Sequence, residues 1–497
     1  MTEMRPEKES LLEKLKKYGE SDFYPFHMPG HKRRELPDGR MGRFPDPYSI
    51  DITEIDGFDN LHHAEGILKE SMERAAEIYG ADRTYYLVNG STCGILSAIC
   101  GCTDWGGRIL TARNCHKSAY HGLILNRLIP EYLYPQYLEE YGINGGIFPE
   151  DVRKALERNR RSGEEKIRAV FIVSPTYEGI VSDVAAIAAI AHEYGIPLIV
   201  DEAHGAHLPF AAPGSVFPES ALNKGADVVI QSLHKTLPSF TQTAVLHIKG
   251  ELADREKIER YLGMFQSSSP SYLFMAAIER CILYMNQDGR KEMEQYEIRM
   301  NDFFRETEKL QVLKVLDRRV VSEPSVYDRD LSKIVISVKN AADLSGEALG
   351  DILRKKYHLE MEMCAPEYVI AMTSLMDTEE GLSRLLKALF EIDGTLEPSF
   401  PETEQEMPLS RLQKAVQKLS PAEAADRQGK RITLSESAGA VSKEFIYLYP
   451  PGIPILAPGE QITEEILAQT EWYRKTGFSV QGLSDPDLSS IITVAKE

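Results

Sequence analysis

The chain has 497 residues, and at about 150 residues per domain this length predicts roughly two to four domains around a large buried core. Hydrophobic residues make up 42% and charged residues 27% of the chain, which is the composition of a folded globular protein. The 76 Asp and Glu residues outnumber the 57 Lys and Arg residues, and the resulting net charge of −19 repels phosphate backbones and anionic lipids. We therefore expect neither nucleic acid nor a membrane as a partner.

The number of cysteines and the length of the apolar runs indicate the cellular compartment of the protein. Six cysteines in so long a chain are too sparse for a disulfide framework, and Cys100 and Cys102 lack the second ligand pair that a zinc site requires. We expect these thiols to be reduced and buried. The first twenty residues are charged and contain no apolar signal segment, and no run of about 18 apolar residues follows that could span a membrane. The sequence therefore predicts a cytoplasmic protein.

Residues 1–64 are predicted to form an N-terminal arm. Apolar positions at helical spacing indicate a helix over residues 9–17, whereas residues 22–60 are rich in Pro, Gly and Asp and have no sustained period. Without a periodic apolar face the arm cannot bury enough surface to fold alone. We expect it to be ordered by packing on another body.

Residues 65–270 are predicted to form a large cofactor-binding domain of the α/β class. A helix over residues 65–80 precedes a series of short apolar runs, which alternate with helices near 117–127 and 183–194. The runs lie at residues 84–88, 108–111, 169–173, 197–200, 226–230 and 244–248. This alternation favours a mostly parallel sheet with helices on both faces.

The pattern changes after residue 270. A long helical stretch near 272–310 leads into short strands that are interleaved with helices near 344–356 and 379–391. We expect a smaller α+β domain over residues 271–394.

The last part of the chain is predicted to form a separate C-terminal domain. Residues 395–408 are acidic and contain three prolines, so they are predicted to be a linker. The C-terminal domain over residues 409–497 is expected to begin with the last helix of the chain, which the apolar and Pro-rich segment 445–458 then follows.

In an open parallel sheet, ligands bind beyond the carboxyl ends of the strands, so the polar residues that follow each apolar run are candidates for a site. The first group is Asn89-Gly90-Ser91-Thr92, whose hydroxyls and backbone N–H groups open a predicted helix. Unpaired N–H groups and the helix dipole both favour an anion such as phosphate. The same residues are equally typical of a plain helix cap, and the sequence leaves both interpretations open.

The second group is Asp201-Glu202-Ala203-His204-Gly205-Ala206-His207, directly after the run IPLIV. A carboxylate that emerges from a buried strand needs a partner such as a metal, an arginine or a protonated heterocycle. Two histidines and two acids within seven residues could instead ligate a metal, but nothing with the spacing H-E-x-x-H accompanies them.

A lysine and a histidine follow two further strands. Lys235 lies in Gln231-Ser232-Leu233-His234-Lys235-Thr236, and a partly desolvated lysine has a lowered pKa that makes it nucleophilic toward carbonyls. This is the requirement for a Schiff-base lysine. His116 follows the run at 108–111, where an imidazole could stack on a flat ring or act as acid or base, although a lone histidine is more often structural.

Together the four groups supply the contacts that pyridoxal 5′-phosphate requires: a phosphate cradle, a ring stacker, a carboxylate for the pyridinium nitrogen and an amine for the aldehyde. The four groups occur in the order phosphate turn, stacking histidine, aspartate and lysine along an α/β chain. In this order the sequence resembles the Orn/Lys/Arg decarboxylases of the aspartate aminotransferase fold type. The resemblance covers nearly the whole chain and rests on the segments His27-Met28-Pro29-Gly30-His31-Lys32, Asp51-Ile52-Thr53-Glu54, Asn89-Gly90-Ser91-Thr92, Asp201-Glu202-Ala203-His204-Gly205, Ser232-Leu233-His234-Lys235-Thr236 and Tyr449-Pro450-Pro451-Gly452-Ile453-Pro454.

This resemblance implies roles for the site residues. It implies that Lys235 binds the cofactor aldehyde, that Asp201 pairs with the pyridine nitrogen and that His116 stacks on the ring. It implies that His204 lies near the phenolic edge of the ring, and that these four residues are the catalytic ones, with no metal. The residues implied to surround the phosphate are Ser91, Thr92, Ser232 and His234.

The resemblance also implies the reaction, which is the decarboxylation of a basic amino acid with release of carbon dioxide and a polyamine-type amine. The chain resembles short members without the N-terminal wing domain, and this similarity slightly favours arginine over lysine or ornithine. The chain departs from the expected pattern at Ala440, where we expect a basic residue.

Other functions use the same residue types. An aminotransferase or an aldolase on the same fold would use the same Lys235 and Asp201, and a non-catalytic regulator could retain the fold. Members of the resembled fold type build each active site at a two-fold interface, so a homodimer or a higher homo-oligomer is expected. We expect residues 27–32 near the cofactor entrance of this chain or of its neighbour.

Overall fold

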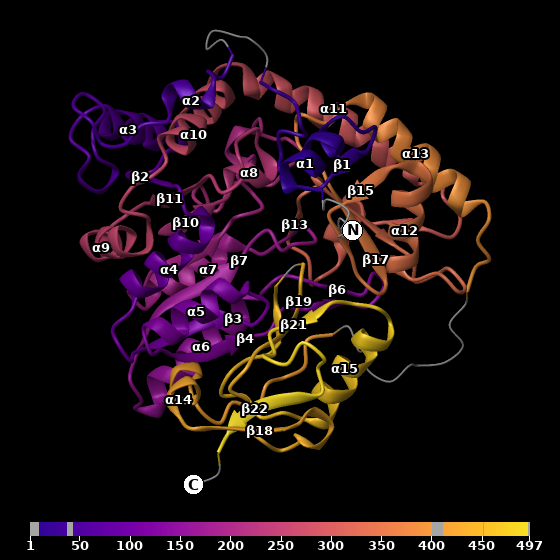
Figure 1. Ribbon diagram of the computed structural model, residues 1–497. Coiled ribbons are helices and arrows are strands. Elements are labelled where there is room, and N and C mark those ends of the chain that lie inside the picture. Colours follow the sequence, from indigo (N-terminus) through magenta and orange to yellow (C-terminus); the bar gives the residue numbers. More distant parts are fainter. Residues whose placement is uncertain (1–8, 37–42, 400–410, 451, 496–497) are drawn as a thin grey trace, which may run out of the picture.

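The computed structural model describes residues 9–36, 43–399, 411–450 and 452–495, and its centre is a seven-stranded sheet (Figure 1). In spatial order the strands are β2 (Arg83–Leu87), β11 (Ala244–Ile248), β10 (Val228–Gln231), β9 (Leu198–Asp201), β7 (Ile167–Val173), β3 (Arg108–Ala112) and β4 (Ile129–Leu133). The pairings of β11 with β2 and β10 are antiparallel, and the other four are parallel. The predicted mostly parallel sheet is confirmed.

Helices cover both faces of this sheet because alternate strand residues point to opposite sides. Ile199 of β9 packs in the core that includes α4, α5 and α9, whereas its neighbours Leu198 and Val200 pack in the core that includes α3, α6 and α7. These helices are α3 (Ile67–Tyr79), α4 (Gly90–Cys102), α5 (Lys117–Leu125), α6 (Pro149–Ser162), α7 (Val184–Glu193) and α9 (Arg255–Phe265). The inner strands β9, β10 and β11 are therefore buried along their whole length, which explains their largely apolar sequences.

A smaller four-stranded sheet follows the long helical stretch. That stretch is α10 (Tyr272–Tyr284), a π-helical turn (Met285–Gly289) and α11 (Arg290–Thr307). The sheet has the order β12 (Lys314–Val315), β14 (Lys333–Ser337), β17 (Tyr368–Met372) and β16 (Met363–Cys364), and the helices of this part are α12 (Gly346–Tyr357) and α13 (Glu379–Asp393). Both helices lie within two residues of their predicted ranges at each end.

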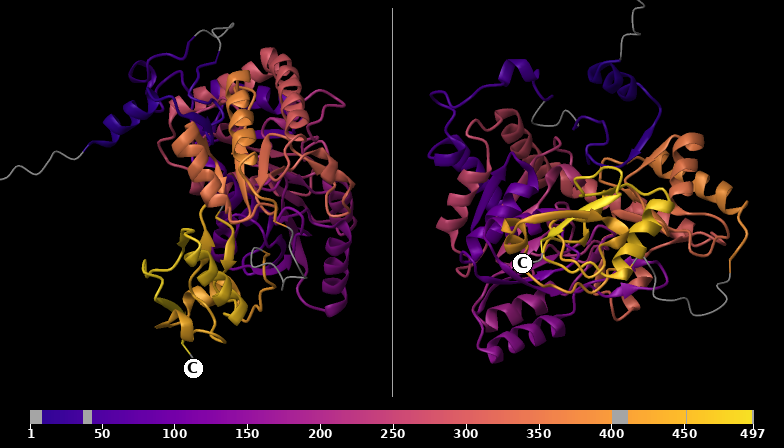
Figure 2. Two further views of the ribbon diagram at one scale, coloured as in Figure 1. Left: turned by 90° about the vertical axis from the view of Figure 1, so that its right-hand side faces the viewer. Right: turned by 60° about the horizontal axis from the view of Figure 1, so that its bottom comes forward.

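The N-terminal arm is ordered by its own chain. Helix α1 (Leu11–Gly19) has no buried residue and stands away from the body (Figure 2), but the following strand β1 (Tyr24–Phe26) pairs in parallel with β15 (Leu359–Met361). Beyond β1, the Lys32 ammonium is buried and donates hydrogen bonds to the carbonyls of Pro25, His27 and Met372. The arm thus needs no second chain for this packing.

The C-terminal part has its own apolar cluster, which includes Ile446, Leu456, Ile466 and Ile491. Its elements are α14 (Pro421–Asp426), β18 (Gly429–Thr433), β19 (Ile446–Leu448), β20 (Pro454–Leu456), α15 (Glu464–Lys475), β21 (Val480–Gln481) and β22 (Ser490–Val494). The prediction that the last helix precedes segment 445–458 is wrong, because α15 follows that segment. Residues 400–408 of the predicted linker lie outside the described residues.

A buried ion pair joins the C-terminal part to the central sheet. Arg113, at the end of β3, lies 3.0 Å from Glu460 and also donates to the carbonyls of Pro454 and Ile455. Both charged side chains are at most 1% exposed. The segment between Pro454 and Glu460 is thereby held against the strand end that carries His116.

All six cysteines are free thiols, of which Cys102 and Cys364 are partly exposed. Within the described ranges, the helices include none that is both long and apolar enough to cross a bilayer.

Candidate active site

A cavity of about 290 Å³ lies beyond the carboxyl ends of the central strands. The large-domain loops supply most of its walls, while Met28 comes from the arm, Glu362 from the bend between β15 and β16, and Tyr449 from the C-terminal part. All eight predicted site residues line it: Ser91, Thr92, His116, Asp201, His204, Ser232, His234 and Lys235. The structure therefore brings together side chains from four separate strand ends, as the rule for open sheets predicts.

Lys235 lies in the one-turn helix α8 (Leu233–Thr236), immediately after β10. Its Nζ is 3.0 Å from His204 Nε2. Burial lowers the pKa of the Lys235 ammonium, and the opposing effect of Asp201 is smaller. The lowered pKa increases the share of unprotonated, nucleophilic amine, which is the state that attacks a carbonyl.

Asp201 is the last residue of β9 and only 5% exposed. It accepts a hydrogen bond from the N–H of Ala203 at 3.1 Å, and no ion pair is formed with it within the described part of the chain. Burial raises the pKa of Asp201, while the nearby Lys235 lowers it. A buried carboxylate with so little compensation fits a cationic ring nitrogen as a missing partner.

The N-terminus of α4 is open toward the cavity. Asn89 is the N-cap residue, but its side chain makes no capping hydrogen bond to the helix and instead accepts from the N–H of Ser267 at 3.2 Å. Ser91 Oγ and Ser232 Oγ are 2.5 Å apart, so two hydroxyls from different elements meet there. The structure thus favours an anion at this end over a plain capping turn.

Three histidines line the cavity, and burial is the main cause of the lowered pKa of each. His116 caps α5 through Nδ1, which lies 3.2 Å from the N–H of Ser118, and its pKa is lowered to about 3. His234 Nδ1 lies 2.9 Å from the carbonyl of Thr243, and its pKa is lowered to about 4. The Nδ1 atom of His204 is buried without a hydrogen-bond partner in the described residues. All three rings are therefore neutral near pH 7.

The acids and histidines of residues 201–207 do not converge on one point. Glu202 accepts from Ser220, Gln231 and the N–H of Ala221. His207 instead lies 3.1 Å from Asp330. In the portion of the chain that the structure describes, no group of three His, Cys, Asp or Glu side chains is placed to hold a metal ion.

Further side chains line the cavity that the strand-end rule did not identify, among them Asn114, Tyr177, Glu362 and Tyr449. Glu362 accepts from the N–H of Met28 at 2.9 Å and from the hydroxyl of Tyr177. The Oδ1 atom of Asn114 is buried and has no partner among the described residues, which makes it a second orphaned group in the cavity. Tyr449 opens the Pro-rich segment on which the family resemblance partly rests, although no role in the site was predicted for it. Glu362 comes from a distant part of the chain and carries no local signal.

Solved structures share the fold. The constitutive lysine decarboxylase of Escherichia coli superposes with a TM-score of 0.71 at 20% identity, over 86% of this chain and 74% of that one. Lysine decarboxylase A from Pseudomonas aeruginosa gives 0.72 at 17% identity, over 89% and 73%. A ureidoglycine-glyoxylate aminotransferase from Bacillus subtilis gives 0.52 at 13% identity, over 66% and 84%. The predicted fold class, that of the pyridoxal phosphate-dependent enzymes of fold type I, is confirmed.

The sequence comparisons are more specific. The model of the Orn/Lys/Arg decarboxylase major domain matches residues 9–343, and the model of its C-terminal domain matches residues 402–477. An arginine decarboxylase of Halalkalibacterium halodurans is 32% identical over 95% of this chain and 94% of its own length. One of Bacillus subtilis is 30% identical over 97% of each chain. The chain belongs to the Orn/Lys/Arg decarboxylase family, and it is a carbon–carbon lyase.

Proposed function

We propose that the protein uses pyridoxal 5′-phosphate to decarboxylate arginine. The observation that carries this proposal is the meeting of Lys235, Asp201 and the open N-terminus of α4 in one cavity. When bound, the cofactor supplies an electron sink for the electrons of the breaking Cα–carboxylate bond. The residues of this chain have to hold it, orient the substrate and move protons.

The cavity residues fit this cofactor. The amine of Lys235 would bind its aldehyde, and Asp201 would hold a proton on the ring nitrogen by opposite-charge stabilisation. His116 would stack on the ring, and the orphaned Nδ1 of His204 would gain a partner near the phenolic edge. The phosphate would be held by Ser91, Thr92, Ser232, His234 and the first N–H groups of α4.

Proton transfer is assigned to Lys235, beside His204. Their nitrogens are 3.0 Å apart, and the lowered pKa of Lys235 lets its amine accept and return a proton, while the neutral ring of His204 orients that amine. After carbon dioxide leaves, Lys235 is the group that we assign to return a proton to Cα. Ile95 and Ile453 also line the cavity and lower the polarity around a substrate carboxylate, which favours its loss as neutral carbon dioxide.

Two observations support arginine as the substrate. Relatives that are 30 to 32% identical over at least 95% of this chain include two named arginine decarboxylases, whereas two lysine decarboxylases of Escherichia coli are 24% identical. Among the cavity-lining residues, Glu362 is the carboxylate besides Asp201, and it directly follows β15, the strand that pairs with the arm. A guanidinium group is the partner that best matches such a carboxylate, because it donates in a fork.

The decisive experiment offers arginine, lysine and ornithine separately to the pure protein and measures carbon dioxide release, with the amine product identified. We expect release from arginine, in amounts equal to the amine formed. Carbon dioxide release from lysine or ornithine but not from arginine would contradict the assignment of arginine as the substrate. Amino-group transfer to a keto acid without carbon dioxide release would contradict the proposal and favour the aminotransferase alternative.

A further inference from the structure

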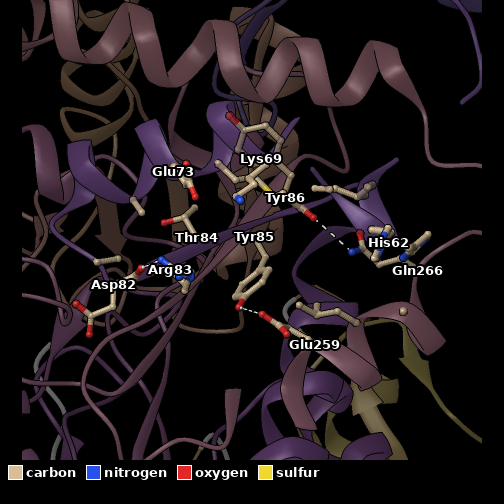
Figure 3. A pocket seen from close by; sticks show the side chains of 18 of the residues that line it. His62, Lys69, Glu73, Asp82, Arg83, Thr84, Tyr85, Tyr86, Glu259 and Gln266 are labelled. Carbon is tan, nitrogen blue, oxygen red and sulfur yellow. Dashed lines mark hydrogen bonds between the residues drawn. The ribbon is translucent and has the colours of Figure 1, made fainter. Parts of the chain in front are cut away.

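The turn that precedes α4 is held by the side chains of Gln242 and Gln266, which come from other parts of the chain. Val88, the last residue before this turn, donates its N–H to Gln266 Oε1 at 2.9 Å. Its carbonyl accepts from Gln242 Nε2 at 2.6 Å. Gln266 also donates to the carbonyl of Tyr86 at 3.3 Å, as Figure 3 shows beside the cavity at β2. At the edge of the sheet, the side-chain amide of Gln266 thus forms the backbone hydrogen bonds with β2 and Val88 that a further strand would otherwise form.

The residues that follow Val88 are fixed in the same manner. Asn89 accepts from the N–H of Ser267, the residue after Gln266, and Gly90 adopts a φ of +72° that favours glycine. The conformation of the turn is therefore set by contacts with the end of α9 and with the loop between α8 and β11. Its own helix contributes no side-chain cap.

The loop that carries Gln242 contacts both ends of the candidate cofactor site. It begins after Lys235, and its Thr243 carbonyl lies 2.9 Å from Nδ1 of His234 in the lysine-bearing helix. Gln242 holds the turn at the other end. Gln242 is exposed, yet its φ is +83°, a conformation that costs any residue other than glycine free energy. An exposed residue held in that conformation by one short hydrogen bond needs an explanation beyond packing.

We propose that Gln242 is a positioning residue that preorganises the phosphate-binding turn and fixes its place relative to Lys235. The inference rests on the proposed cofactor site. With Gln242 in place, the N–H groups of Gly90 to Thr92 converge before the phosphate arrives. Without it, the phosphate itself must order the turn, and the conformational entropy lost at that moment weakens binding.

The test compares pyridoxal 5′-phosphate with pyridoxal, which has the same aldehyde and ring but no phosphate. Gln242→Gly removes the amide without adding backbone strain, because glycine adopts a positive φ freely, so a loss of affinity is assigned to the missing hydrogen bond. Dissociation constants are measured by spectroscopic titration of the full chain freed of cofactor, and its melting temperature is recorded. Asp343→Gly is the matched control, because Asp343 also has a positive φ of +56° but does not line the cavity.

We expect Gln242→Gly to weaken the affinity for pyridoxal 5′-phosphate about threefold to tenfold, the loss that one neutral hydrogen bond predicts. Its affinity for pyridoxal and its melting temperature without cofactor should stay unchanged, and Asp343→Gly should change neither affinity. Equal losses for both compounds, or no loss for either, would overturn the inference. If the unsubstituted chain binds neither compound, the proposed function fails, and the inference fails with it.

Discussion

The amine of Lys235 has lost most of its water but has gained a single neutral hydrogen-bond partner, His204. Such an environment favours the uncharged amine, which is the reactive form. Because the amine makes so few stabilising contacts, replacing Lys235 should not destabilise the fold. Lys235→Ala is therefore expected to abolish carbon dioxide release while the melting temperature of the cofactor-free chain is retained. Borohydride trapping should place the cofactor on the peptide that contains Lys235. Label on another peptide, such as that of Lys117, would contradict the assignment.

Asp201 is the second residue whose role can be isolated. Asn has the same shape but carries no charge, so Asp201→Asn should still bind cofactor yet lose the stabilisation of the ring-nitrogen proton. We expect turnover to fall by roughly two to four orders of magnitude, since one charge partner in a buried site is worth several kcal/mol in the transition state. The measurement is single-turnover decarboxylation at saturating cofactor. A rate close to that of the unsubstituted chain would exclude this role.

At the scale of residues, the sequence predicted those site residues that directly follow a strand. All eight predicted side chains lie in one cavity because each follows the end of a strand, and parallel strands end at the same edge. Glu362 was not predicted because no rule of spacing connects residues from separate parts of the chain, and Tyr449 was part of a quoted motif but was given no role in the site. The orphaned Asn114 was overlooked for another reason: its burial depends on packing, which a single sequence does not contain.

Strand β11 carries a buried histidine that couples folding to pH. His247 is fully buried between Thr84 and Gln231, and burial lowers its pKa to about 3. In the unfolded chain its pKa is about 6.5, so below that pH the unfolded state binds a proton that the folded state does not. The free energy of unfolding should therefore fall as the pH falls from about 6.5 toward 3.

At pH 5 this single residue accounts for a loss of about 2 kcal/mol relative to pH 7.5. Urea unfolding at both pH values measures it. His247→Gln should lose about 2 kcal/mol less stability between the two conditions than the unsubstituted chain. Identical losses in the two proteins would contradict the prediction.

The link between the C-terminal part and the central sheet rests on Arg113 and Glu460. Glu460→Gln leaves the buried Arg113 guanidinium without its countercharge, and we expect a loss of about 3 to 5 kcal/mol in the free energy of unfolding. The exposed pair of Arg153 and Glu193 is the control, because solvent screens this pair and Glu193→Gln should change the free energy of unfolding little. Urea denaturation of both variants gives the comparison, and equal losses would show that burial is not the cause.

At the scale of elements, long periodic segments were predictable and irregular ones were not. Helices α3 and α13 lie close to their expected ranges because amphipathic spacing is encoded locally. Helix α15 was missed although it has a Thr463 cap and two acids in its first turn. Strand β1 has only three residues and exists because β15 is beside it, so no local pattern could reveal it.

For the whole molecule we propose a homodimer, and the arm supplies the test. Deleting residues 1–34 removes β1, Met28 from the cavity and the buried Lys32, so decarboxylation and dimerisation should both decrease. Deleting residues 1–20 removes α1 with its exposed Leu11 and Leu12 but keeps β1, and should have a milder effect on activity. Sedimentation and carbon dioxide release are measured on each. A fully active monomer at low concentration would contradict the proposal.

The domain boundaries at residues 64, 270, 394 and 408 stay predictions. Changes in composition along the chain predicted where one segment ends and the next begins. The way in which these segments meet at the cavity depends on long-range packing, which composition does not contain. The expectation that residues 27–32 lie at the entrance agrees with the position of Met28, and the relevant site is that of the same chain. The N–H of Gly30 donates to the carbonyl of His234 at 2.7 Å, which places this segment directly on the lysine-bearing helix.

The pairing of β1 with β15 also orders events during synthesis. Tyr24 leaves the ribosome early, but its partner Leu359 is made only after most of the chain has emerged. At about 5 to 20 residues per second, the first strand waits roughly 20 to 70 seconds for its partner. During this interval Lys32 cannot be buried against Met372, and the lysine-bearing helix lacks its cover. The first segment to be synthesised therefore covers the lysine-bearing helix only after residues 359–372 have emerged from the ribosome.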